Sequence, residues 1–252
     1  MTTETTGMPE FAIVREGDVR DHDVDHAIER VRSLLEKVDE PILFARLKFT
    51  HLPDSGRALP ALAQATIDIN GDVVRAQTAG ETVRHATDEL RERLRSQLEQ
   101  RSHRRQIGRG ETLPRWQETR RPEYIELPPE ERELVRRKTF PVGAMTPEEA
   151  AFDMEQLDHD FYLFVDLNSG LDAVVRRGEG EYRVHFAGPT PDNPPPGFVF
   201  TDVTPTEMSV EDAIQRIETT GQRNLFFVNT ETGRGNVLYQ RYDGHYGLIT
   251  PE

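Results

Sequence analysis

The 252-residue sequence contains no cysteine, and this absence removes several classes of protein at once. Without thiols there is no disulfide framework, no thiolate-bound zinc and no cysteine nucleophile. Long apolar runs are missing too, since no stretch approaches the roughly 18 residues that a membrane-spanning helix needs. The first ten residues, MTTETTGMPE, carry neither the basic nor the apolar part of a secretion signal. We therefore expect a soluble, cytoplasmic protein.

Hydrophobic residues are scarce, at 35% of the chain. This is lean for a single large core, so several small modules joined by polar linkers are expected. Charge is plentiful but uneven. The net charge is −14, and residues 139–252 hold 19 acidic side chains against 7 basic ones, whereas residues 1–110 are nearly balanced. We expect the acidic part to contact protein, while the N-terminal part can still bind a polyanion such as nucleic acid.

A predicted hairpin followed by a helix organises the N-terminal part. Apolar side chains alternate over residues 61–69, which predicts a half-buried strand. Asn70 and Gly71 follow, and this pair favours a tight hairpin turn because both residues tolerate positive φ. A short return strand is expected over residues 73–78. After it, the apolar period changes to that of a helix with arginines along one flank.

Three further elements are predicted upstream of this hairpin. They are a strand over residues 11–14, a helix over residues 18–38 and a strand over residues 42–50. In the last of these strands, the alternating pattern predicts that one face is buried, with side chains from Leu43, Ala45, Leu47 and Phe49. The order strand, helix, three strands, helix favours an α+β two-layer sandwich, a four-stranded sheet with both helices on one face, over residues 9–107.

The arginines of the second helix have two interpretations. Acidic residues lie three or four positions away, at Asp88, Glu92 and Glu99, so ion pairs on a solvated surface could account for them. Residues 84–121 nevertheless hold eleven basic side chains against six acidic ones, which is unusual in so acidic a chain. The alternative is that the arginines bind a polyanion.

Two histidines near the start of the first helix could suggest a metal site. His22 and His26 stand four residues apart with Asp23 and Asp25 between them, a spacing at which helical side chains can share an ion. No second cluster of ligands is evident in the sequence. A polar helix start is the preferred interpretation, and we expect neither a metal nor another cofactor.

Residues 108–134 are charged and interrupted by glycine and proline, which predicts a linker. The only tryptophan, Trp116, lies within it beside Arg115. These side chains could stack on and pair with single-stranded nucleic acid. An aromatic side chain packed against the following domain is an equally good interpretation.

The C-terminal part is an internal repeat. With an offset of 63 positions, Met145 matches Met208 and Gly170 matches Gly233, which defines module 1 (residues 135–187) and module 2 (residues 198–252). A proline-rich spacer, residues 188–197, separates them. Each module is expected to hold one helix followed by a few strands. So small a module has a thin core, and its aromatic sheet should need a partner to cover it.

With both parts in view, the chain resembles the long form of the ribosome hibernation-promoting factor family. TIDINGDVVRAQTAGETVRHATDELRERL resembles its ribosome-binding domain, while KTFPVGAMTPEEAAFDMEQLDHDFYLFVD and NVLYQRYDGHYGLI resemble its C-terminal module. The resemblance implies a β-α-β-β-β-α domain that binds 16S rRNA of the small subunit near the decoding centre and blocks mRNA and tRNA. The rRNA-binding candidates are Arg30, Arg32, Lys37, Arg75, Arg84, Arg91, Arg95, Arg101, Arg104 and Arg105.

Long members of this family usually carry one C-terminal module, which pairs with its copy on another chain. Because this chain carries two, we expect them to pair within the chain or between chains, and pairing within the chain would hold single 70S ribosomes. The pairing candidates are Phe161, Phe164, Val174, Tyr182, Phe226, Val228, Tyr239 and Tyr246. An alternative function is an acidic, dimerising protein-interaction regulator without rRNA binding. An enzyme is not expected, since no nucleophile–base set is recognisable.

Overall fold

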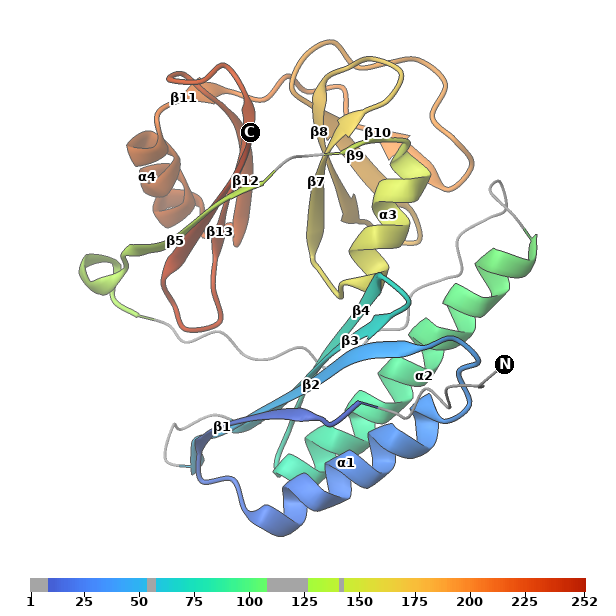
Figure 1. Cartoon of the computed structure of the whole chain (residues 1–252). Helices are drawn as coiled ribbons and strands as arrows, with labels where there is room; N and C mark the ends of the chain where they lie inside the picture. The colour runs from blue at the N-terminus through green and yellow to red at the C-terminus, as the bar shows by residue number, and fades with distance from the viewer. Residues whose placement is uncertain (1–8, 54–57, 108–126, 141–142) are drawn as a thin grey trace. The chain divides into compact units, whose positions relative to one another are not determined.

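The computed structural model describes residues 9–53, 58–107, 127–140 and 143–252, so Trp116 and most of the predicted linker lie outside the described residues. The described residues form two compact units (Figure 1). The first contains elements β1 to α2 and the second contains β5 to β14. Both are α+β, as predicted. No helix in the described part of the chain is long and apolar enough to cross a membrane.

The first unit is the predicted two-layer sandwich. Its elements are, in chain order, β1 (Ala12–Gly17), α1 (Asp21–Leu35), β2 (Ile42–His51), β3 (Ala61–Ile69), β4 (Asp72–Gly80) and α2 (Val83–Ile107). The sheet order is β1-β2-β3-β4, with β1 parallel to β2 and the other neighbours antiparallel. Both helices cover one face of this sheet (Figure 1).

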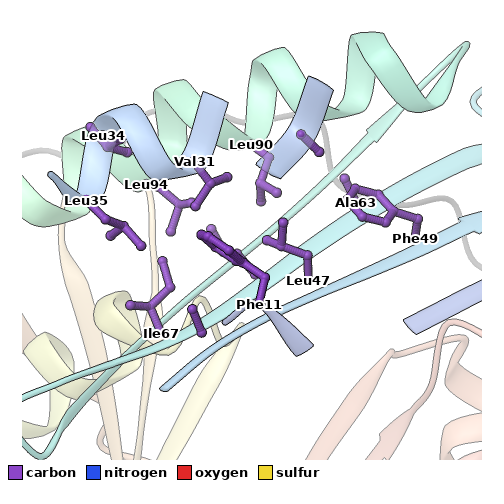
Figure 2. Close-up of a cluster of buried hydrophobic side chains, with 14 of the residues drawn as sticks. Phe11, Val31, Leu34, Leu35, Leu47, Phe49, Ala63, Ile67, Leu90 and Leu94 are labelled. Atoms are coloured by element: carbon purple, nitrogen blue, oxygen red, sulfur yellow. The ribbon is translucent and has the colours of Figure 1, made fainter. Parts of the chain in front are cut away.

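Apolar side chains from the sheet and from both helices form one core between the two layers (Figure 2). Leu47 and Phe49 of β2 are fully buried there, together with Leu94 of α2. Leu43 departs from the prediction, because its side chain is 57% exposed. A register shift between Ile42 and Phe44 interrupts the alternation of β2, and it is Ile42 that is buried.

The predicted hairpin is confirmed. Asn70 and Gly71 have φ values of 54° and 96°, and the Gly71 N–H donates to the Asp68 carboxylate at 2.8 Å. The return strand β4 runs to Gly80 and is longer than predicted. A Cβ at Gly80 would lie 2.6 Å from the backbone nitrogen of Ala86, so glycine allows the end of β4 to approach the start of α2 closely.

The second unit contains the two repeats. Module 1 consists of β6 (Ala144–Met145), α3 (Pro147–Gln156), β7 (Phe161–Asp166), β8 (Asp172–Arg177) and β9 (Tyr182–Phe186). Module 2 has the same order, with β11 (Glu207–Met208), α4 (Val210–Thr220), β12 (Asn224–Asn229), β13 (Gly235–Gln240) and β14 (Tyr246–Pro251). A 3-10 turn, Pro129–Glu131, precedes them.

Both module helices begin with a side-chain cap. Thr146 and Glu149 form a reciprocal capping box, in which each side chain accepts from the backbone N–H of the other residue, at 3.1 and 3.3 Å. In module 2, the Ser209 hydroxyl accepts from the Asp212 backbone N–H at 3.1 Å. These caps fix where each helix starts, and therefore where the strands that follow it can begin.

The two modules exchange strands. β5 (Leu134–Phe140) begins module 1 but lies parallel to β14 of module 2, with Arg136 opposite Gly247. β10 (Phe198–Phe200) begins module 2 but lies parallel to β9 of module 1, with Val199 opposite Arg183. The two pairings occupy equivalent positions of the repeat. The sequence pattern did not predict β5. Its residues do not alternate regularly, and the strand that it pairs with, β14, is distant in the sequence.

Candidate functional site

Basic side chains from the two helices of the first unit meet around Asp88. Its carboxylate lies 3.4 Å from Arg30 Nε of α1 and 3.4 Å from Nε2 of His26. Arg84 of α2 has its Nη2 3.5 Å from Nδ1 of the same histidine. The packing of α1 on α2 thus places Arg30 and Arg84 beside each other, although they are distant in sequence.

One turn further along α2, two more candidates share an acidic neighbour. Arg91 and Arg95 both pair with Glu92, the second at 2.8 Å. The side chains of Arg95 and Glu92 are 54% and 51% exposed. The ion pairs expected as the alternative interpretation are therefore present. Exposed pairs contribute only about 0–1 kcal/mol each, so a phosphate group could take the place of Glu92 at little cost.

The remaining candidates of α1 and α2 vary in what the structure shows. Arg32 is exposed, and its guanidinium carbon lies 5.8 Å from the centroid of the Phe11 ring. Lys37 is exposed in the turn after α1. Arg104 and Arg105 belong to the last turns of α2, but their side chains lie outside the described residues.

Arg75 lies on a different surface from the helix arginines. Val74 and Ala76 beside it in β4 face the helices, so Arg75 is exposed on the open face of the sheet. The strand registers place Arg46 of β2 and Arg75 of β4 opposite the same residue of β3, Thr66. Arg46 is therefore a candidate that the sequence analysis did not select. The sequence feature that could have identified Arg46 is its position on the polar side of the alternating β2 segment.

Arg101 is a correction to the predicted set. Its side chain is only 7% exposed and donates to Glu40 at 3.0 Å, to Asp72 at 3.0 Å and to the backbone carbonyl of Ile69 at 3.2 Å. These bonds tie the end of α2 to the loop after α1 and to the β3–β4 hairpin. A guanidinium so enclosed stabilises the fold and is withdrawn from the rRNA-binding candidates.

The two histidines considered for a metal have separate partners. His22 Nε2 lies 3.2 Å from Asp23, whereas His26 faces Asp88 and Arg84. Among the described residues, no group of three or more His, Asp or Glu side chains is arranged to hold a metal ion.

A second candidate surface joins the two C-terminal modules. Leu163 and Val174 of module 1 form one buried cluster with Phe226 and Val237 of module 2. Leu163 and Phe226 occupy equivalent positions of the repeat, and so do Val174 and Val237. The cluster is thus built like the contact of a two-fold dimer, in which equivalent residues from both partners meet.

Aromatic contacts flank this cluster. The ring of Phe161 lies 5.7 Å from that of Tyr239, and the ring of His185 meets Phe226 edge-on at 5.5 Å. His185 also hydrogen-bonds through Nε2 to the backbone carbonyl of Val203. Burial lowers the pKa of His185, a change that the carbonyl opposes and that nearby Arg176 reinforces.

One charged contact also joins the modules. Asp172 of β8 accepts from Arg234 through both oxygens, with both N–O distances at 2.8 Å, and from the backbone N–H of Gly235 at 2.8 Å. Asp172 is 7% exposed. Its hydrogen bonds and charge raise the pKa of Arg234 above the usual value. This is a bidentate pair, the strongest geometry available to arginine and a carboxylate.

Four of the eight pairing candidates lie at the apolar cluster or its aromatic flank, namely Phe161, Val174, Phe226 and Tyr239. A fifth, Tyr182, touches module 2 elsewhere, where it stacks on Phe198 of the exchanged strand β10. Phe164 is fully buried, on the opposite side of β7 from Leu163, and Tyr246 belongs to the helix-side core of module 2. Val228 is not part of the cluster. Because side chains alternate along a strand, aromatic content alone cannot say which of the two faces is covered.

Comparison with known proteins gives matches for both parts of the chain. A family model described as "Sigma 54 modulation/S30EA ribosomal protein C terminus" matches residues 129–184 and again residues 201–248. The chain is similar to the dormancy associated translation inhibitor of Mycobacterium tuberculosis (strain ATCC 25618 / H37Rv), with 34% identity over 206 residues, which cover 76% of this chain and 71% of that protein. It is 29% identical to the ribosome hibernation promotion factor of Deinococcus radiodurans over 168 residues, 62% of this chain and 86% of the other.

A solved structure of a ribosomal subunit interface protein from Coxiella burnetii also matches. It covers 37% of this chain and 97% of its own, with 16% identity and a TM-score of 0.32.

Replacing Arg101 should destabilise the first unit. Arg101→Ala removes the hydrogen bonds that this guanidinium donates to Glu40, to Asp72 and to the Ile69 carbonyl, so we expect the free energy of unfolding to fall by about 2–3 kcal/mol. The exposed Arg95→Ala serves as control and should change it by less than about 0.5 kcal/mol. Amide hydrogen exchange of β3 and β4 peptides would measure this unit separately. Equal effects of both substitutions would contradict a structural role for Arg101.

The contact between the modules should weaken in acid. Since the pKa of His185 is lowered from 6.5 in the folded chain, the unfolded chain binds the proton more tightly, and stability is lost as pH falls below about 6.5. Urea unfolding of the second unit at pH 7.5 and pH 5.0 would measure the loss. His185→Phe retains a ring against Phe226 but cannot be protonated, so its unfolding should depend less on pH. A pH dependence identical to that of the unchanged chain would refute the assignment.

Proposed function

The chain belongs to the long-form ribosome hibernation-promoting factor family, as a member with two tandem C-terminal modules, and on that premise we propose that it silences and protects ribosomes during dormancy or stress. It acts in the cytoplasm, where ribosomes are, by binding and not by catalysis, and it needs no cofactor. It binds the small subunit near the decoding centre and keeps mRNA and tRNA out.

One observation carries this proposal. The similarity to a dormancy associated translation inhibitor extends over 206 residues, so it includes more than the repeated module alone. The similarity to a ribosome hibernation promotion factor covers 86% of that protein's length. These relatives support a ribosome-directed function and give no support to the alternative of an acidic regulator that does not bind rRNA.

The contact with 16S rRNA falls, in this proposal, on the helix surface that carries Arg30, Arg84, Arg91 and Arg95. Arginine suits this task because its planar fork binds phosphate through two hydrogen bonds and stacks on bases. The acidic partners of Arg30, Arg91 and Arg95 are exposed, so these ion pairs can be exchanged for phosphate contacts. Arg46 and Arg75 would form a separate contact on the open face of the sheet.

The two modules pair with each other within one chain, in this proposal. The spacer between them is ten residues long, which keeps the local concentration of each module very high around the other. The buried cluster of Leu163, Val174, Phe226 and Val237 supports this arrangement. A chain whose pairing surface is already occupied has none left for a second chain, so it would hold single 70S ribosomes and would not join two of them.

Removing Arg91 and Arg95 should weaken binding to the small subunit and reduce its dependence on salt. Each phosphate contact contributes roughly 0.7–0.9 to the slope of log K against log salt, so the Arg91→Ala, Arg95→Ala double variant should lose about 1.5. Arg183→Ala with Arg216→Ala removes the same charge from the second unit and serves as control. Binding of purified 30S subunits at several salt concentrations would test this, and an unchanged slope would rule these arginines out.

Ribosomes mixed with the purified chain should sediment as 70S particles. Intrachain pairing predicts that sucrose gradients show no rise at 100S over ribosomes alone, even with the chain in excess. A large 100S peak would refute intrachain pairing, while it would still agree with ribosome binding.

A further inference from the structure

The contact between the modules has approximate two-fold symmetry in its apolar centre but not at its charged edge. Position 172 of module 1 corresponds to position 235 of module 2, and position 171 corresponds to position 234. Module 1 has Leu171 and Asp172 there, whereas module 2 has Arg234 and Gly235. Three of these positions meet across the contact, where Asp172 binds both Arg234 and the backbone of Gly235.

At the charged edge of the contact, there is room for one side chain between the modules but not for two. A Cβ placed on Gly235 would lie 2.8 Å from Cβ of Asp172 and 2.8 Å from a ring carbon of Phe226. Both neighbours are nearly or wholly buried, at 7% and 3% exposure, so neither can move into solvent easily. Glycine is therefore required opposite Asp172.

From this asymmetry we infer that the contact is specialised for a mixed pair, in which module 1 meets module 2. Asp172 on one side, with Arg234 and Gly235 on the other, favours this pair and opposes the pairing of either module with its own copy. The inference rests on the proposed function, in which the modules pair, and it specifies which module each of them accepts as a partner.

Pairing of module 1 with another module 1 would fail for two reasons. The place of Gly235 would be taken by a second Asp172, whose side chain has no room. The place of Arg234 would be taken by Leu171, so two carboxylates would be buried near each other without a cation. A buried charge that loses its partner is strongly destabilising.

Pairing of module 2 with another module 2 would also be unfavourable, though less so. Two glycines would meet where Asp172 now fills the space, which leaves a gap in the packing. Each Arg234 would lose its bidentate carboxylate partner. Only the mixed pair fills the space and satisfies the charges.

The consequence concerns which chains can associate. Each chain contains one module of each kind, so the mixed pair can form within the chain, where the ten-residue spacer favours it. A module displaced from its partner finds no suitable contact on the matching module of another chain. The charged edge would thus suppress the like pairs that tie one chain to the next.

Exchanging the edge residues between modules in the full chain tests the inference. In one variant, Arg234→Leu and Gly235→Asp are joined by Phe226→Leu, because the Phe226 ring would itself obstruct a side chain at position 235, and both modules then have the residues of module 1. In a second, Leu171→Arg, Asp172→Gly and Leu163→Phe give both modules the residues of module 2. In a third, all six substitutions are combined, so the chain again holds one module of each kind with the charges exchanged.

Amide hydrogen exchange of β8 and β13 would report the contact, and that of α3 and α4 would report whether each module is still folded. We expect the first two variants to exchange at least about 10-fold faster in β8 and β13, with the helices still protected. The combined variant should recover most of the protection. Full protection in the first two variants, or no recovery in the third, would overturn the inference.

Sedimentation of the unchanged chain separates this inference from the proposed function. A dimer held by mixed pairs between two chains would defeat intrachain pairing, yet the order of protection among the variants would still hold. Failure to bind ribosomes would defeat the proposed function and leave the exchange experiment unaffected. Preferential association of the first variant into dimers with β8 and β13 protected would show that like modules do pair, and would overturn the inference directly.

Discussion

The second unit depends on one constraint: neither module has a complete sheet or a covered face by itself. β5 completes the sheet of module 2 and β10 completes that of module 1, so each module lends a strand to the other. The inner faces of both sheets then bury one shared cluster. A module of about 50 residues buries little apolar surface by itself, and sharing strands and core adds to what each module buries.

The first unit solves the same problem within itself, because its two helices cover a whole sheet face. This leaves its outer surfaces available for charge. Arg30 and Arg95 each pair with an exposed acidic neighbour, which orients them without binding them tightly. Arg101 shows the opposite case, since three acceptors enclose it and it contributes to the fold. The same residue type thus serves two purposes, and burial separates them.

Much of the fold could be predicted because its signals are local. The turn at Asn70 and Gly71, the caps at Thr146 and Ser209 and the order of elements all depend on residues close in sequence. The strand β5 could not be predicted, since it is charged, lacks regular alternation and exists as a strand only beside β14. The predicted burial of Leu43 was wrong because a register shift, which depends on the neighbouring strand β3, interrupts the alternation of β2.

The candidate sites divide in the same way. The sequence by itself determined that an arginine-rich helix follows a hairpin and that two equivalent modules follow a linker, because residue type, spacing and repetition are written in the chain. Only the tertiary structure decided that Arg101 is enclosed and that Arg46 and Arg75 lie opposite the same residue of β3. It also decided that Leu163 rather than Phe164 faces the other module. Burial and pairing depend on which distant residues meet, and that is a property of the packed chain and not of any one segment.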